Sequence, residues 1–295
     1  LDERGEALLT RECRGVLAAT SPLVPTARLA PLALPEGRPV WRLPPEVLAA
    51  AAHDDAMSPS ALEKVVTCPF AWVLEHRARL REGAVAALGN GPLLYGKLAH
   101  RLVEELHAEG AFDLAEAPFL QQVAARFEAL LPREGATLLL PGASIERLQI
   151  GRQMAAAMRS LHRYLAGADF RIASVEEVVA TEAAIGLLRG RLDLRLVDAQ
   201  GRAAVLDLKW GDSHSRRQLE KGGAIQLAVY ARAIGDDVPA AYFALASGKL
   251  LAQDARMKPE RAIAGAPLDE TWRRVAATAK AVVATLARGE IPVAH

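Results

Sequence analysis

Two alternating apolar and polar runs around a short turn-forming tetrapeptide constrain the fold of this chain more than any other feature. Residues 189–209 read RGRLDLRLVDAQGRAAVLDLK, and Asp198–Gly201 separates the two runs. Alternation with a period of two, interrupted by Asp and Gly, is typical of a β-hairpin. Asp193 falls in the first predicted strand. Asp207 and Lys209 share one face at the end of the second, because side chains alternate along a strand.

A helix that follows this hairpin adds two polar side chains. Gln226 and Tyr230 lie four residues apart in AIQLAVYA, so a helix places them on one face. Two carboxylates and an ammonium at one sheet edge are costly to bring together, and a bound divalent cation and a phosphate would offset that cost. The alternative is a surface cluster in which Asp193 and Asp207 pair with Lys209 and Arg191, which would contribute little stability.

These motifs, in this order, resemble the nuclease core of the PD-(D/E)xK superfamily, and most closely its RecB-like branch. That branch includes the nuclease domains of AddB and RecB and the CRISPR-associated RecB-like exonucleases. Its pattern is G-R-[IL]-D, then D-x-K after a hairpin, then Q-x-x-x-Y on a helix; here Leu192 replaces the proline of the superfamily name. The catalytic residues implied by the resemblance are Asp193, Asp207, Lys209, Gln226 and Tyr230.

The resemblance also implies a metal site for Mg²⁺ or Mn²⁺. Asp193, Asp207 and the backbone carbonyl of Leu208 supply oxygen ligands in this family, and such ligands suit both ions. Gly96–His100 matches a G-x-x-x-H motif whose histidine joins the metal site. The family often carries a glutamate on the strand before GRLD, and Glu182, followed by Glu177, is the candidate. A solvent-facing strand residue is the alternative for either glutamate.

The segment SPSALEK…CPF, residues 58–70, resembles the one that precedes the core in RecB-like nucleases. Ser60 and Glu63 predict a capping box at the start of its helix. In many AddB-type members the cysteine of CPF and cysteines near the C-terminus ligate an iron–sulfur cluster, which needs four ligands. The chain contains only two cysteines, Cys13 and Cys68. We therefore expect no iron–sulfur cluster, no disulfide framework, and a reducing cytoplasmic location.

Nucleic-acid contact must come from local clusters, because the formal net charge is only +1. Residues 211–223, GDSHSRRQLEKGG, are predicted to form a polar loop beside the site that carries Arg216, Arg217 and Lys221. A predicted helix over residues 143–165 carries an arginine stripe that includes Arg152 and Arg159. Both sets are candidates for phosphate contact, and a solvated surface is the alternative.

The expected fold class is α/β (α+β), a mixed central sheet of about four or five strands flanked by helices. It corresponds to a restriction-endonuclease-like core with a helical insertion. Proline-rich residues 1–57 predict an extended arm or the tail of a preceding domain, and residues 58–295 a RecB-like nuclease domain. Within that domain we expect a helical part at about 58–168, a catalytic α/β core at about 169–250 and a C-terminal helix at about 268–288. No apolar run approaches a membrane span, and a chain beginning at Leu1 is expected to be a piece of a longer protein.

The function implied by the resemblance is that of a divalent-metal-dependent deoxyribonuclease. It would act as an exonuclease on single-stranded DNA or DNA ends in double-strand-break repair and recombination. Its partner would be a helicase subunit or helicase-like domains preceding it in the same chain, with no membrane involved. The alternatives are an inactive DNA-binding or scaffold domain of a helicase–nuclease complex, and an unrelated α/β protein acting on small phosphorylated ligands. A P-loop would favour the last alternative, and the sequence contains none.

Overall fold

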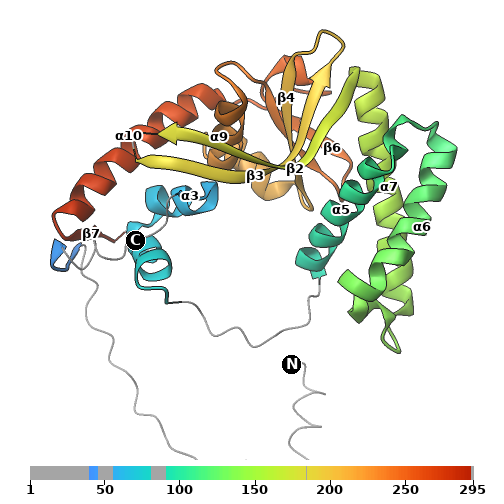
Figure 1. Cartoon of the computed structure of the whole chain (residues 1–295), viewed down its shortest axis with the longest axis horizontal. Helices are drawn as coiled ribbons and strands as arrows, with labels where there is room; N and C mark the ends of the chain where they lie inside the picture. The colour runs from blue at the N-terminus through green and yellow to red at the C-terminus, as the bar shows by residue number, and fades with distance from the viewer. Residues whose placement is uncertain (1–39, 46–55, 81–90, 184, 294–295) are drawn as a thin grey trace, which may run out of the picture. The chain divides into compact units, whose positions relative to one another are not determined.

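The computed structural model describes residues 40–45, 56–80, 91–183 and 185–293 (Figure 1). Most of the expected N-terminal arm, including Cys13, therefore lies outside the described residues. Three residues of that segment form β1 (Val40–Arg42), which pairs antiparallel with β7 (Glu290–Pro292) in a two-stranded sheet.

The central sheet has five strands in the order β2-β3-β4-β5-β6. Only β4 and β5 pair in parallel, and the other neighbours are antiparallel. The predicted mixed α/β architecture of about four or five strands with a restriction-endonuclease-like core is thus confirmed. The strands are β2 (Phe170–Ala183), β3 (Gly186–Asp198), β4 (Ala203–Lys209), β5 (Ala240–Ala244) and β6 (Lys249–Ala252).

The predicted hairpin is the β3–β4 pair, and its turn is built by Asp198. One carboxylate oxygen of Asp198, Oδ1, accepts hydrogen bonds from the backbone N–H groups of Gln200 (3.0 Å) and Arg202 (2.9 Å). This is an Asx turn, in which an aspartate side chain replaces backbone turn contacts. The strands after it are central, because β4 from Ala204 to Leu208 and all of β5 are buried, as expected where both faces of a sheet are covered.

Three long helices form the expected helical insertion on one side of the sheet, where the first and third lie against the strands and the second packs on these two helices (Figure 1). They are α5 (Gly91–Ala108), α6 (Glu116–Glu134) and α7 (Ser144–Ala168), with 3₁₀ helices at Ala111–Asp113 and Ala136–Leu139 between them. Leu94, Leu98, Leu102 and Leu106 recur every fourth residue on the buried face of α5. This stripe belongs to the same apolar core as Leu208 of β4, which fixes α5 against the strand that carries the D-L-K motif.

The other face of the sheet carries α8 (Ser213–Glu220), α9 (Ile225–Ile234) and α10 (Leu268–Ala287). The prediction of a loop over residues 211–223 is therefore wrong. Ser215 and Leu219 are four residues apart and buried, and the packing of Leu219 in an apolar core holds this short polar segment helical. A 3₁₀ helix, η4 (Ala255–Met257), lies between β6 and α10.

The N-terminal helical segment comprises α3 (Pro59–Thr67), α4 (Pro69–Trp72) and a π-helical turn, η1 (Val73–Arg77). Its cap differs from the predicted capping box, because Ser58 rather than Ser60 precedes the helix and accepts a hydrogen bond from the Ala61 N–H at 3.1 Å. Pro59 at the first helical position explains the shift, since its missing N–H costs nothing there.

A second apolar core supports the outer half of the β2–β3 pair, which reaches beyond the other strands (Figure 1). It joins Leu62 and Val65 of α3, Leu188 of β3 and Val275 and Ala279 of α10. The Met57–Leu188 bridge lies at its edge. Among the helices of the described ranges, none has the length and apolar character to span a bilayer.

Candidate active site

His100, Asp193 and the end of β4 come together although they are far apart in the sequence. His100 Nε2 lies 3.1 Å from the carbonyl oxygen of Leu208, and its Nδ1 lies 3.5 Å from Asp193 Oδ1. The other oxygen of Asp193, Oδ2, accepts a hydrogen bond from the Leu208 N–H at 2.6 Å. Three of the predicted metal-site positions therefore lie side by side between α5, β3 and β4, with Asp193 and the Leu208 carbonyl on different nitrogens of His100.

Lys209 forms the rim of this site and connects it to α9. Its Nζ lies 2.6 Å from Asp207 Oδ2 and donates to Gln226 Oε1 at 3.1 Å. Gln226 Nε2 in turn donates to the Tyr230 hydroxyl oxygen at 3.2 Å. The predicted helix pair of Gln226 and Tyr230 thus holds the lysine from one side.

Tyr242 contacts Lys209 through its aromatic ring and was not identified from the sequence. The Lys209 ammonium lies 5.7 Å from the centre of its ring, within the range of a cation–π contact. Tyr242 pairs in register with Asp207 across β4 and β5, so the position follows from the parallel pairing of two strands. No local motif indicates that pairing.

Glu176 is a second residue that sequence reasoning missed. It lies on β2, with Oε1 3.3 Å from His100 Nδ1. The antiparallel register pairs Glu177 with Leu192 and Val175 with Leu194, which puts Glu176 opposite Asp193. Pairing of Ala183 with Gly186 sets the register that puts Glu176 opposite Asp193. The turn of this hairpin was not predicted from the sequence, so Glu176 could not be identified.

The two glutamates considered from the sequence lie elsewhere. Glu182 is exposed and pairs with Leu187 near the far end of the β2–β3 hairpin, and it is not among the residues that surround His100. Glu177 is the immediate neighbour of Glu176, but its carboxylate contacts Ser174 and Arg195. Moving one residue along a strand reverses the face on which a side chain lies.

The residues present fit a divalent cation. His100, Glu176 and Asp193 each offer one ligand atom, and the three atoms lie within 4.8 Å of one another. Asp207 is not part of this trio; its side chain is only 1% exposed, and its Oδ1 has no hydrogen-bond partner in the described residues. An unpartnered buried carboxylate oxygen beside further carboxylates is stable only with a compensating positive charge. One imidazole and several carboxylate oxygens suit Mg²⁺ or Mn²⁺.

The pKa values of Asp193, Asp207 and His100 are all raised, because carboxylates are buried close together in the site. Burial raises the pKa of Asp193 to about 7, with the charge of Asp207 as a further cause. Burial also raises the pKa of Asp207, although Lys209 opposes the shift. Burial would lower the pKa of His100, but its hydrogen bond to Glu176 and the neighbouring carboxylates raise it to about 8.

His100 therefore carries a positive charge among these oxygens near neutral pH. Both ring nitrogens face acceptors, Nδ1 the carboxylates of Glu176 and Asp193 and Nε2 the carbonyl of Leu208, so both must be protonated to donate. The imidazolium supplies the positive charge that a metal would otherwise provide. Because metal ligands must be deprotonated, a cation binding here must displace protons from His100 and Asp193.

Gly190, the glycine of GRLD, is explained by close packing. A Cβ at this position would lie 2.7 Å from Tyr230 Cε1 and 2.9 Å from Pro59 Cγ, distances shorter than carbon atoms tolerate. The strand, the start of α3 and the ring of Tyr230 therefore meet at a point with no room for a side chain. The glycine thereby links the N-terminal helix to the site.

The predicted DNA-contacting cations occupy two places. Arg216, Arg217 and Lys221 lie on or directly after α8, next to the end of β4. On α7, Arg159 is ion-paired with Glu116 of α6 at 3.3 Å, whereas Arg152 is exposed and has no ion pair among the described residues. The charge of Arg159 is therefore partly neutralised within the helical layer.

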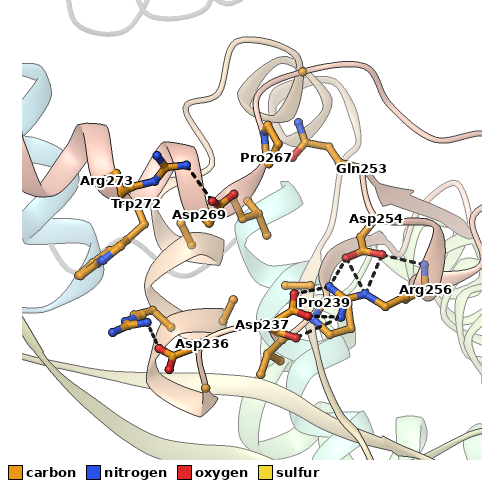
Figure 2. A pocket seen from close by; sticks show the side chains of 18 of the residues that line it. Asp236, Asp237, Pro239, Gln253, Asp254, Arg256, Pro267, Asp269, Trp272 and Arg273 are labelled. Carbon is orange, nitrogen blue, oxygen red and sulfur yellow. Dashed lines mark hydrogen bonds and ion pairs between the residues drawn. The ribbon is translucent and has the colours of Figure 1, made fainter.

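A separate cavity of about 650 Å³ lies around the start of β5, at the opposite end of the parallel strands from Lys209 (Figure 2). Its acidic and basic side chains neutralise one another. Arg256 pairs with Asp237 at 2.8 Å and with Asp254 at 2.7 Å, and Arg273 pairs with Asp269 at 2.9 Å. This balance makes the cavity a poor site for a phosphate or a metal ion.

The fold and the site together define a restriction-endonuclease-like α/β protein, with an acidic cluster and a lysine at the end of a central strand. A sequence model of the PD-(D/E)XK nuclease superfamily matches residues 56–295, and the chain belongs to that superfamily. Membership implies a nuclease, which is a hydrolase, and members of the superfamily use divalent metals. A search of curated proteins found no significant match.

Proposed function

We propose that the chain is a divalent-metal-dependent deoxyribonuclease of the RecB-like branch, using Mg²⁺ or Mn²⁺. It acts as an exonuclease on single-stranded DNA or DNA ends in double-strand-break repair. One observation carries this proposal: His100, Glu176 and Asp193 offer ligand atoms within 4.8 Å of one another, with the Leu208 carbonyl on the other side of the His100 ring and Lys209 at the rim. A surface salt-bridge cluster would not bury Asp207 completely or leave one of its oxygens unpartnered.

A bound divalent cation would supply an activated water near neutral pH and offset negative charge on the scissile phosphate. His100, Glu176, Asp193 and the Leu208 carbonyl would hold it, with Asp207 next to them. The chain itself positions Lys209. Of the three N–H groups of Lys209, Asp207 and Gln226 engage two, which leaves one for a phosphate oxygen.

Lys209 acts as a charged donor rather than as a general base. Burial would lower its pKa, but the charge and the hydrogen bond of Asp207 raise it above the usual value. The ammonium therefore keeps its proton at neutral pH. Gln226 fixes the direction of the side chain, and Tyr230 fixes Gln226 in turn.

The RecB-like assignment is supported by motifs that are separated in the sequence and meet in space. Gly190 packs against Tyr230, which accepts a hydrogen bond from Gln226, and Gln226 accepts one from Lys209. Asp193 accepts a hydrogen bond from the N–H of Leu208, the residue before Lys209. The assignment implies a helicase subunit, or preceding helicase-like domains, as the partner. We also propose residues 58–295 as the nuclease domain, with the proline-rich residues 1–57 as an arm or the tail of a preceding domain.

Degradation of labelled single-stranded DNA tests the function. Wild-type protein should degrade linear DNA with Mg²⁺ or Mn²⁺ and lose activity in EDTA, and Asp207→Ala should be inactive. Asp237→Asn is the matched control, because Asp237 is an exposed carboxylate of the distant cavity. Comparing linear with circular single strands distinguishes an exonuclease, which spares the circles.

Three results would count against the proposal. Equal degradation by wild type and Asp207→Ala would show that a contaminant is responsible. Metal-independent degradation would exclude the proposed site. DNA binding without degradation under any metal would favour the inactive scaffold domain instead.

A further inference from the structure

A basic cleft of about 1010 Å³ opens beside the edge strand β6, between α7 and α8. Four different segments contribute its basic side chains, which are Arg163, Arg216, Lys249, Lys258 and Arg261. Among the described residues, the acidic side chains that line it are Glu220 and Glu260. The cleft therefore attracts anions, in contrast to the charge-balanced cavity at the other end of the parallel strands.

Three of these cations have no partner within the described part of the chain. Arg163 is bound by both oxygens of Glu116, and Lys258 donates to the carbonyl of Ala168 at 2.6 Å. Arg216, Lys249 and Arg261 make no side-chain hydrogen bond or ion pair with any described residue. Exposed or half-exposed cations grouped in a hollow without carboxylate partners are suited to phosphate groups.

The sheet places this cleft next to the active site. Lys209 pairs in register with Ala244 of β5, and Ala244 pairs with Lys249 of β6. Two strand spacings separate the backbones of Lys209 and Lys249, a distance of roughly 10 Å. Arg216 belongs to α8, which begins four residues after Lys209. Lys209 of the active site and Lys249 of the cleft therefore lie close together along one edge of the strands.

The position of Lys249 is fixed by the turn before it. Gly248 has φ +65°, and a Cβ there would lie 2.5 Å from Ser160 Oγ of α7. The β5–β6 turn therefore packs directly on α7, which a residue other than glycine would prevent. Lys249 follows at once and stands at the boundary between helix and sheet edge.

We propose that this cleft binds a single strand of the DNA substrate adjacent to the site of hydrolysis, an inference that rests on the proposed nuclease function. Its volume is that of a large ligand pocket, which accepts a few nucleotides of one strand but not a duplex. Single-strand sites combine a basic groove with aromatic surface for the bases, and Tyr164, half-buried, provides such surface in the cleft.

Binding measurements in EDTA test this cleft without cleavage. The triple variant Arg216→Gln, Lys249→Gln, Arg261→Gln removes the three unpartnered cations. The matched control, Arg171→Gln, Arg273→Gln, Lys280→Gln, removes three exposed cations that do not line the cleft. The triple variant should bind a long single strand about 10- to 100-fold more weakly. The slope of log affinity against log salt should fall by about 2, since each lost phosphate contact contributes about 0.7 for single strands.

Two comparisons would overturn the proposal. One is equal single-strand affinity and salt slope for the triple variant and the control. The other is an equal loss of affinity for a blunt duplex, which would mean a general electrostatic effect. In Mn²⁺, the triple variant should show a higher KM for the long strand than the control. If wild-type protein cleaves no DNA, the nuclease proposal fails, but the binding comparison still decides the role of the cleft.

Discussion

Replacing Asp193 with asparagine should stabilise the metal-free protein while it abolishes hydrolysis. The pKa of Asp193 rises from an ordinary value of 3.8 to about 7, because the carboxylate is buried beside Asp207. At about 1.4 kcal/mol per pKa unit, ionising it in the folded protein at pH 8 costs up to about 4 kcal/mol. Part of the gain is lost because His100 loses a charged neighbour, so we expect a gain of about 1–3 kcal/mol. Asparagine can still accept the hydrogen bond from the Leu208 N–H.

The gain must depend on pH. The folded protein binds more protons than the unfolded chain at Asp193 above pH 3.8, and at His100 between pH 6.5 and about 8. The stability of the metal-free wild type therefore falls as pH rises through this range, with a slope of up to about 1.4 kcal/mol per pH unit for each proton. Near pH 5.5 Asp193 is mostly protonated in the folded protein but ionised in the unfolded chain, so the gain from Asp193→Asn should be roughly half of that at pH 8, and it should vanish only near pH 3.8. The contribution of His100 is fully present below pH 6.5 and is lost as pH rises through about 8.

Urea unfolding in EDTA at pH 5.5 and pH 8 measures the effect. For a domain of this size, 1 kcal/mol corresponds to roughly 2–4 °C, so thermal unfolding should show a rise of roughly 2–12 °C at pH 8. Adding Mn²⁺ at pH 8 should stabilise the wild type but not the variant, which reduces or reverses the difference. A variant that is less stable at pH 8, or whose gain is the same at both pH values, would refute the argument.

Three further substitutions probe the surroundings of the site. Gly190→Ala forces a methyl group against Tyr230, so we expect a loss of about 1–3 kcal/mol in urea unfolding and reduced DNase activity; unchanged values of both would contradict the packing argument. Lys209→Met leaves the buried Asp207 without its ion pair and should cost about 3–5 kcal/mol in EDTA, with partial recovery in Mn²⁺; recovery is the test, because a loss of apolar packing alone would not respond to metal. Leu102→Ala opens a cavity under α5 and should cost about 2–5 kcal/mol, measured the same way; a cost below 1 kcal/mol would show that the core at Leu102 relaxes.

The sequence was sufficient to predict the relative positions of residues that depend on local strand or helix geometry. Alternation along 189–209, with Asp198 at the turn, determines the faces of Asp193, Asp207 and Lys209, and the structure brings these residues together as expected. The spacing of Gln226 and Tyr230 likewise needs only a helix. Such residues can be placed because the periods of strands and helices are properties of the chain itself.

Residues whose position depends on pairing between distant segments were not identified. Glu176 faces His100 because of the β2–β3 register, which a bulge between Ile172 and Ser174 shifts, and no sequence pattern located the turn. Tyr242 contacts Lys209 because β4 and β5 pair in parallel, although α8 and α9 separate these strands in the sequence. The segment that forms α8 was predicted to be a loop because it is almost entirely polar. Ser215 and Leu219 are its buried residues, which is too weak a pattern to predict a helix.

The second apolar core, which joins α3, α10 and the outer half of the β2–β3 hairpin, limits how far the chain can be shortened. Gly190 and Tyr230 are held in part by Pro59, and Leu188 packs with residues from both α3 and α10. A fragment trimmed to the span of the conspicuous motifs would expose these apolar contacts to water. A stable fragment must therefore retain α3 and α10, which support the β2–β3 hairpin from both sides. Both helices lie well outside the stretch of sequence that contains the acidic residues.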